Sequence, residues 1–227
     1  MKFLAVIPAR SNSQSIKRKN TFIVNKKPLI QYTFEEVKKS RIEKKYLLTD
    51  DNKIKKLSKK FNISAEYLRP KKFSKNTTSL SDTLFHFHQW TLNKKIEYDY
   101  LVVLQPTSPL RNYKDINSAI DIIKRKKYKS LFSISHSLEH PYETIKFDKK
   151  RNWKHVLSKS KLYYRRQDFD FGSYFINGAI YIIHKELVIK KRIFNKKNHG
   201  FLIMPKYRSI DINDLSDIQI VKGLLKT

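Results

Sequence analysis

The residue types with the clearest chemical meaning are cations gathered in one short segment near the N-terminus. The segment follows an apolar run at positions 3–7 that has the length and β-branched content of a buried parallel strand. A cationic loop at the carboxyl end of a first strand is where open α/β sheets bind phosphates. A guanidinium bridges two phosphate oxygens as a planar fork, and an ammonium supplies a mobile point charge. A solvated basic loop is the alternative in a chain this rich in lysine. The cations are Arg10, Lys17, Arg18 and Lys19.

Further polar motifs follow this loop in a recognisable order. They are PAR at 8–10 with Ser13 and KN at 19–20, LRP at 68–70 with Ser79, LQPTSPLR at 104–111, and NGAIYI at 177–182 with SIDI at 209–212. In order and spacing the set resembles the CMP-sugar synthetases, cytidylyltransferases that activate sialic-acid-like sugars and 3-deoxy-octulosonate. The resemblance runs nearly end to end. LQPTSPLR and the Asn-Gly-Ala strand favour the acylneuraminate branch.

The resemblance implies attack by the anomeric hydroxyl of a nonulosonic acid on the α-phosphate of CTP, with pyrophosphate leaving. Such a reaction depends on charge neutralisation and in-line positioning more than on a covalent nucleophile. Arg10, Lys19 and Asp211 are the implied catalytic residues. The implied nucleotide-binding residues are Arg10, Ser13, Lys19, Asn20, Arg69 and Ser79. The implied sugar-binding residues are Gln105, Thr107, Ser108, Arg111, Arg166 and Asn177. Asp211 and Asn213 are the implied ligands of Mg²⁺, a hard cation that prefers oxygen ligands.

Two departures from the family pattern bear on activity. Gln14 and Ser15 stand where relatives have a glycine-rich loop with a lysine, so a phosphate-binding charge is missing. Asn213 replaces the second aspartate of the metal pair, and its amide offers an oxygen without a charge. A 3-deoxy-octulosonate cytidylyltransferase and a catalytically impaired module that binds nucleotide, sugar or a polyanion therefore stay open as alternatives.

Composition narrows the class of protein. The 227 residues contain no cysteine, which excludes disulfides, thiolate metal sites and a cysteine nucleophile. The N-terminal apolar run is shorter than the apolar region of a signal peptide, and no stretch reaches the ~20 apolar residues of a membrane span, so we expect a cytoplasmic protein. The net charge of +29 attracts polyanions in general. Because lysines occur throughout the chain, we expect nucleic acid to bind weakly and without sequence preference.

Apolar periodicity predicts alternating strands and helices, which indicates one α/β domain over 1–227. The fold expected is a Rossmann-like three-layer sandwich with a mostly parallel sheet. Caps are expected at Asp51, Ser79, Asn112 and Asp214. The carboxylates Asp50 and Asp51 also suggest a metal site, although capping by Asp51 is favoured. The expected strands are 46–49, 65–68, 100–104, 131–134 and 179–183.

The stretch 136–172 interrupts this alternation with short aromatic and basic runs of no clear period. A loop of that length is uncommon in a compact domain unless it has a function or its own structure. In the resembling family an arm inserted here pairs two subunits and lends residues to the neighbouring site. We therefore expect a dimerisation arm and a homodimer, with a long surface loop as the alternative.

Overall fold

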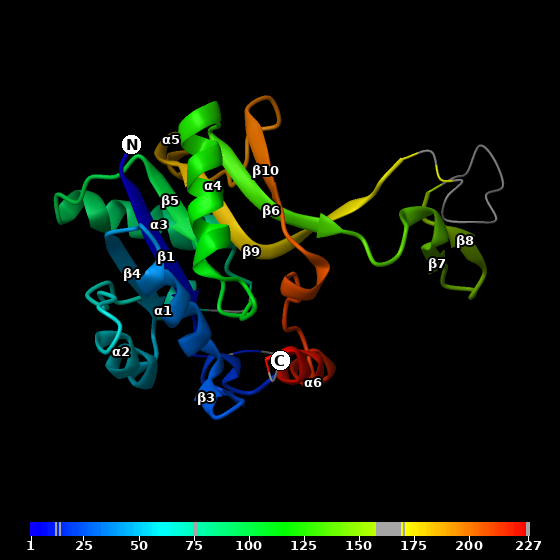
Figure 1. The fold of residues 1–227 in the computed structure, drawn as a ribbon, viewed down its shortest axis with the longest axis horizontal. Coiled ribbons are helices and arrows are strands. Elements are labelled where there is room, and N and C mark those ends of the chain that lie inside the picture. The colour runs from blue at the N-terminus through cyan, green and yellow to red at the C-terminus, as the bar shows by residue number, and fades with distance from the viewer. Residues whose placement is uncertain (12, 14, 75–76, 158–168, 170, 226–227) are drawn as a thin grey trace.

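A six-stranded sheet runs through the centre of the protein, described here by a computed structural model (Figure 1). The structure describes all residues except 12, 14, 75–76, 158–168, 170 and 226–227. The strand order is β10-β6-β9-β5-β1-β4, in which β9 is antiparallel to both neighbours and the other pairs are parallel. The strands are β1 (Phe3–Ala9), β4 (Lys44–Thr49), β5 (Tyr100–Val103), β6 (Ser130–His136), β9 (Tyr174–His184) and β10 (His199–Ile203).

Helices cover both faces of this sheet and complete three layers. On one face, Ile30 and Phe34 of α1 pack with Ile116 and Ile120 of α4 against β1 and β5. On the other face α3 and α5 bury a second apolar cluster. The helices are α1 (Leu29–Lys39), α2 (Asn52–Lys59), α3 (Leu80–Asn93), α4 (Tyr113–Lys126), α5 (Lys185–Ile189) and α6 (Leu215–Leu224). The expected three-layer α/β fold is confirmed.

Side-chain caps fix where the helices begin. The Asp51 carboxylate accepts from the backbone N–H groups of α2, and Ser79 accepts from the backbone of Asp82 in α3. Asn112 and Asp214 form complete capping boxes at α4 and α6. Each box satisfies helix N–H groups that have no partner within the helix. These predicted caps are confirmed, and Asp51 is therefore a cap.

Two sequence expectations for strands are corrected. Residues 65–68 are not a strand, because this stretch meets β4 only through isolated bridges from Ser64 and Leu68. The strand β10 was not expected, since HGFLI is short and follows a lysine-rich turn. It pairs in parallel with β6 at the edge of the sheet. Here tertiary pairing outweighs local pattern.

The described residues between β6 and β9 project away from the body of the protein (Figure 1). They contain the 3₁₀ helix η3 (Pro141–Glu143) and a hairpin of β7 (Ile145–Phe147) and β8 (Trp153–His155). Trp153 is 62% exposed and Phe147 is similarly exposed. The described residues of 136–172 thus extend beyond the body of the protein. Their role as a dimerisation arm stays a prediction.

Candidate active site

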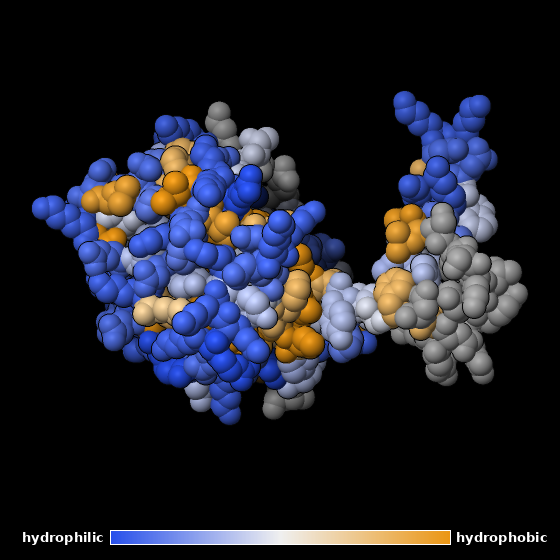
Figure 2. Space-filling view, turned by 90° about the horizontal axis from the view of Figure 1, so that it is seen from above, coloured by the Kyte–Doolittle hydropathy of each residue, from blue (hydrophilic) through white to orange (hydrophobic). Residues whose placement is uncertain are grey.

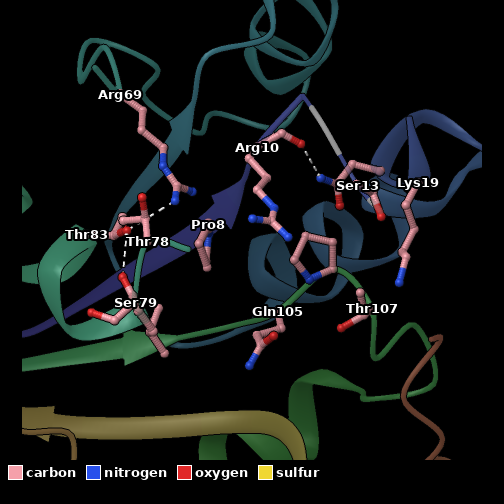
Figure 3. A pocket seen from close by; sticks show the side chains of 13 residues that line it. Pro8, Arg10, Ser13, Lys19, Arg69, Thr78, Ser79, Thr83, Gln105 and Thr107 are labelled. Atoms are coloured by element: carbon pink, nitrogen blue, oxygen red, sulfur yellow. Dashed lines mark hydrogen bonds between the residues drawn. The ribbon is translucent and has the colours of Figure 1, made fainter. Parts of the chain in front are cut away.

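A cavity of about 290 Å³ opens at the carboxyl ends of β1 and β5 (Figure 3). Parallel strands direct their carboxyl ends to the same edge, and open α/β sheets bind ligands there. The first loop forms one side of the cavity, and the segment leading into α3 forms the other. The lining residues are Pro8, Arg10, Ser13, Lys19, Asn20, Arg69, Thr78, Ser79, Leu80, Thr83, Gln105, Pro106 and Thr107. All six residues expected to bind nucleotide are among them.

The first loop is fixed at both ends by hydrogen bonds. Asn20 Nδ2 donates to the Arg10 carbonyl at 2.9 Å, which closes the loop on itself. The backbone N–H and hydroxyl of Ser11 donate to Asp50 at 2.7 and 2.9 Å. Asp50 therefore anchors the loop to the end of β4, a role that sequence reasoning missed. Arg10 is held over the centre of the cavity (Figure 3).

Lys19 joins the first loop to the segment after β10. Its Nζ donates to the carbonyls of Ile212 at 2.9 Å and Asn213 at 3.1 Å. Burial lowers the pKa of Lys19, while the nearby Asp211 carboxylate opposes that shift. Because its two hydrogen bonds go to neutral carbonyls, the Lys19 ammonium is still able to bind an anion in the cavity.

The opposite side of the cavity is organised around Arg69, which is nearly buried. Its Nε and Nη2 donate to the Phe73 carbonyl at 3.0 and 2.6 Å, and Nη2 also reaches Thr83 Oγ1 at 3.1 Å. Burial lowers the pKa of Arg69. Ser79 lies beside it as the cap of α3, and the Thr83 hydroxyl donates to the Ser79 carbonyl. Thr83 was missed by sequence reasoning because it reads as an ordinary helix residue.

Part of the LQPTSPLR motif reaches the cavity and part lies beneath it. Gln105 and Thr107 line the cavity, whereas Ser108 and Arg111 are buried. Arg111 is only 1% exposed, and its guanidinium donates to the carbonyls of Gln105 and Ala179 and to Thr33 Oγ1. Burial lowers the pKa of Arg111 to about 10. Arg111 therefore supports the backbone beneath the cavity and does not line the cavity itself.

Asn177 is also buried, and its side chain makes hydrogen bonds to other residues of the protein. Its amide accepts from Ser133 Oγ at 2.6 Å and donates to Ser209 Oγ at 2.9 Å, which ties β6 and β9 to the segment before Asp211. Gly178 follows with φ of +72°, a conformation that favours glycine. A side chain there would meet Gln105, Tyr181 and Asp211 within about 4 Å. Tyr181 thus belongs to the site, although its sequence position marked it only as a strand residue.

Asp211 occupies the edge of this group and is mostly buried. Its Oδ1 is buried and has no hydrogen-bond partner within the part of the chain that the structure describes. Burial raises the pKa of Asp211, and the Thr107 hydroxyl and Lys19 oppose that rise. An unsatisfied buried carboxylate oxygen costs free energy unless a cation or proton meets it. The atom therefore fits a hard cation such as Mg²⁺.

Asn213 lies beside this carboxylate, and its role as a second ligand of a metal stays a prediction. Its side-chain nitrogen donates back to the Asp211 carbonyl at 3.2 Å, and the residue is exposed. Its backbone carbonyl accepts from Ser15 as well as from Lys19. Among the described residues no cluster of three or more His, Cys, Asp or Glu is placed to hold a metal. The expected sugar ligand Arg166 lies outside the described residues.

The assembled site holds two cations over one end of a cavity and a third cation with hydroxyls at the other. The Asp211 carboxylate lies beside Lys19 and Thr107 but is not among the residues that line the cavity. Such a site suits a polyphosphate bearing a polar heterocycle, since guanidinium and ammonium groups bind phosphate while Arg69, Ser79 and Thr83 offer directed hydrogen bonds. The lining includes serine and threonine hydroxyls, but no His, Asp or Glu among the described lining residues stands beside them as a general base, which favours direct transfer between bound substrates.

Comparisons with known proteins bear on this geometry. The cytidylyltransferase family profile matches residues 4–216. A CMP-N,N'-diacetyllegionaminic acid synthase of Legionella pneumophila is 30% identical over 100% of this chain and 97% of its own. An N-acylneuraminate cytidylyltransferase of Escherichia coli is 29% identical over 96% of this chain, which spans 51% of that protein. A CMP:2-keto-3-deoxy-manno-octonic acid synthetase structure complexed with CTP has a TM-score of 0.71 at 15% identity, covering 100% of this chain and 99% of its own.

Proposed function

Because the chain belongs to the cytidylyltransferase family, we propose that it transfers CMP from CTP to the anomeric hydroxyl of a nonulosonic acid and releases pyrophosphate. One observation supports this most strongly. The cavity brings together all six expected nucleotide-binding residues, although they come from two segments, 10–20 and 69–79, that are far apart in the sequence. The similarity to proteins named for sialic and legionaminic acids favours this sugar class over octulosonate.

The transfer requires the triphosphate to be held and its charge offset. Arg10 and Lys19 bind the phosphates from one side, because both present cations to the cavity from the first loop. Arg69, Ser79 and Thr83 bind the cytosine ring, whose carbonyl and ring nitrogen accept hydrogen bonds. Gln105 and Thr107 then lie where the sugar acid approaches. In this arrangement the α-phosphate lies between the bound nucleotide and the sugar acid, so that the anomeric hydroxyl can attack in line.

Magnesium is the cofactor proposed for this reaction. Asp211 would hold it, since its buried Oδ1 has no other partner within the described part of the chain. When bound, the ion neutralises phosphate charge and polarises the α-phosphate. Asn213 would supply at most a neutral oxygen, which makes the site weaker in charge than one built on two aspartates.

A cytoplasmic homodimer is part of the proposal. The arm carries exposed apolar side chains, including Leu138, Phe147 and Trp153, and such surfaces mark interaction sites. No helix within the described residues is long and apolar enough to cross a membrane. Sedimentation of the wild type and of a Phe147→Ser, Trp153→Ser variant tests the dimer. The proposal expects a dimer for the first and a monomer for the second.

A pyrophosphate-release assay tests the activity. The protein with Mg²⁺ is given CTP, ATP, GTP or UTP together with sialic, legionaminic, pseudaminic or octulosonic acid. We expect release with CTP and at least one nonulosonic acid. Faster release with octulosonic acid would favour a 3-deoxy-octulosonate cytidylyltransferase. If none of the acids supports pyrophosphate release, the non-catalytic binding module is favoured.

A further inference from the structure

Two segments far apart in the sequence concentrate positive charge at one end of the sheet. Residues 124–129 (KRKKYK) and 185–197 (KELVIKKRIFNKK) contain eleven Lys or Arg and one Glu. These 19 residues therefore carry +10 of the net +29 of the 227-residue chain. The charge is thus less evenly scattered than the sequence suggested. We call the surface of these two segments the basic face.

Specific contacts hold the two segments together. Lys129 donates through its backbone N–H to Asn198 Oδ1 at 2.8 Å and through Nζ to Glu186 at 2.8 Å. The backbone N–H of His184 donates to the Lys129 carbonyl at 2.9 Å. Gly200 has no side chain to separate β10 from the Tyr128 ring, which lies where a Cβ would stand. These contacts fix the two segments of the basic face relative to each other.

Most of these cations make no ion pair with the described residues. Ion pairs join Lys129 to Glu186, Lys185 to Asp99 and Lys191 to Asp82. Within the described part of the chain, none is recorded for Lys190, Arg192, Lys196 or Lys197, all of which are exposed. Like charges held this close repel one another, so an anion that bridges them would relieve the repulsion.

The basic face is hollowed and has an aromatic side chain in the hollow. A cavity of about 690 Å³ is lined by the cations of residues 190–197, by the ion pair of Lys129 with Glu186, and by Leu187, Ile193 and Phe194. Phe194 is 42% exposed, and its ring packs edge-on against Phe132 and His199. Cations around an exposed ring offer phosphate contacts and a stacking surface in one place.

The basic face is remote from the proposed active site. The candidate active site lies at the carboxyl ends of the parallel strands, while the basic face lies where β6 begins and the antiparallel β9 ends. The seven residues of β6 separate the two ends of the sheet by about 20 Å. Figure 2 views the protein from the end at which α4 stops and α5 starts, and the surface there is largely hydrophilic. CTP bound at the first loop leaves this face open.

We propose that the basic face binds single-stranded nucleic acid without sequence preference. The phosphates contact Lys190, Arg192, Lys196 and Lys197, and a base stacks on Phe194. A single strand fits better than a duplex, because its bases are free to stack on a ring. An anionic membrane fits less well, since the aromatic ring lies in a hollow rather than protruding. Nothing in this proposal depends on the transfer of CMP.

The test compares two variants that remove the same charge. In the face variant, Lys190, Arg192, Lys196 and Lys197 are all changed to Gln. In the control variant, the exposed residues Lys53, Lys56, Lys59 and Lys60 at α2 are changed to Gln. Fluorescence anisotropy measures binding of a labelled 20-nucleotide oligo-dT from about 50 to 200 mM salt. Circular dichroism and the thermal midpoint confirm that both variants fold.

We expect the face variant to lose at least tenfold in affinity and the control variant less than threefold. The salt slope of log K should fall by about 3 in the face variant, as four lost phosphate contacts on a single strand require. Phe194→Leu should weaken binding at least fivefold with little change in the slope. Equal losses in the two charge variants, tighter binding to duplex DNA, or preferential binding to phosphatidylglycerol vesicles would overturn the proposal.

Discussion

At the scale of single residues, Arg69 links the fold of the cavity to its choice of nucleotide. Arg69→Ala should weaken CTP binding by about 1.5–3 kcal/mol, because a charge-assisted hydrogen bond to cytosine is lost. Calorimetric titration with CTP and UTP measures the effect. Arg125→Ala is the matched control, since it removes an exposed guanidinium that does not line the cavity and should leave CTP binding unchanged. Equal affinities of the wild type for all four nucleotides would refute this role.

Asp211 and Asn213 should respond to mutation in opposite directions. Asp211→Ala should abolish turnover, because its carboxylate is the proposed ligand of Mg²⁺. Asn213→Asp should lower the magnesium concentration at half-maximal rate by adding a second negative charge beside the first. Rates measured across a magnesium titration provide the readout. Full activity in Asp211→Ala, or an unchanged titration in an active Asn213→Asp enzyme, would show that the metal site is elsewhere.

The sequence identified the residues of the nucleotide cavity better than those expected at the sugar. The expected nucleotide ligands all line one cavity, where the loop that follows β1 meets the segment that leads into α3. Arg111 and Asn177 were expected to contact sugar, but they are buried and hydrogen-bonded within the protein. Burial depends on tertiary packing, which a motif does not encode. Tyr181 and Thr83 were missed for the same reason.

At the scale of elements, an ion pair holds the segment that carries Asp211. Arg208 donates to Asp115 at 2.8 Å and so ties the 3₁₀ helix η5 (Lys206–Arg208) to the start of α4. Arg208→Gln should reduce kcat by about 10- to 100-fold, because misplaced reacting groups lose proximity, while the KM for CTP stays near the wild-type value. Arg208→Lys should recover part of the rate.

Steady-state kinetics with varied CTP distinguish this positioning role from simple loss of fold. A variant that is merely unstable would lose activity in proportion to its unfolded fraction, and its thermal midpoint would be lower than that of the wild type. A Glu97→Gln variant is the control, since it removes an exposed ion pair with Lys2 at the other end of the sheet. An unchanged kcat in Arg208→Gln would mean that η5 positions itself without Asp115.

The helices were more predictable from sequence than the strands. Caps at Asp51, Ser79, Asn112 and Asp214 are local signals, because the side chain bonds to a backbone group two or three residues on. Strand identity depends on partners far along the chain. The edge strand β10 exists through its pairing with β6, and residues 65–68 follow β4 without forming a ladder. These outcomes could not be read from local pattern.

At the scale of the whole molecule, acid should destabilise the protein through its histidines. Burial lowers the pKa of four of them below the ordinary value of 6.5: His86, His88, His184 and His199. As pH falls through about 6.5, the unfolded chain takes up protons that the folded chain does not. The histidines should therefore make their whole contribution to the free energy of unfolding above about pH 6.5, and this contribution should be lost as the pH falls below that value.

Thermal unfolding at pH 7.5, 6.5 and 5.5 measures this loss. The midpoint should fall with pH, and His88→Gln should reduce the dependence, because one buried group that must stay neutral is gone. His155→Gln on the exposed arm is the matched control and should leave the pH dependence as in the wild type. A midpoint that rises toward pH 5.5 would contradict the prediction.

The transfer of CMP is the central claim, and mass spectrometry of the reaction product tests it most directly. The protein is incubated with CTP, Mg²⁺ and a nonulosonic acid, and the amount of product is compared with the amount of pyrophosphate released. We predict a CMP-nonulosonic acid conjugate formed in a one-to-one ratio with pyrophosphate, and no conjugate from the Asp211→Ala variant. Intact CTP with every nonulosonic acid, or free CMP without a sugar conjugate, would contradict the account.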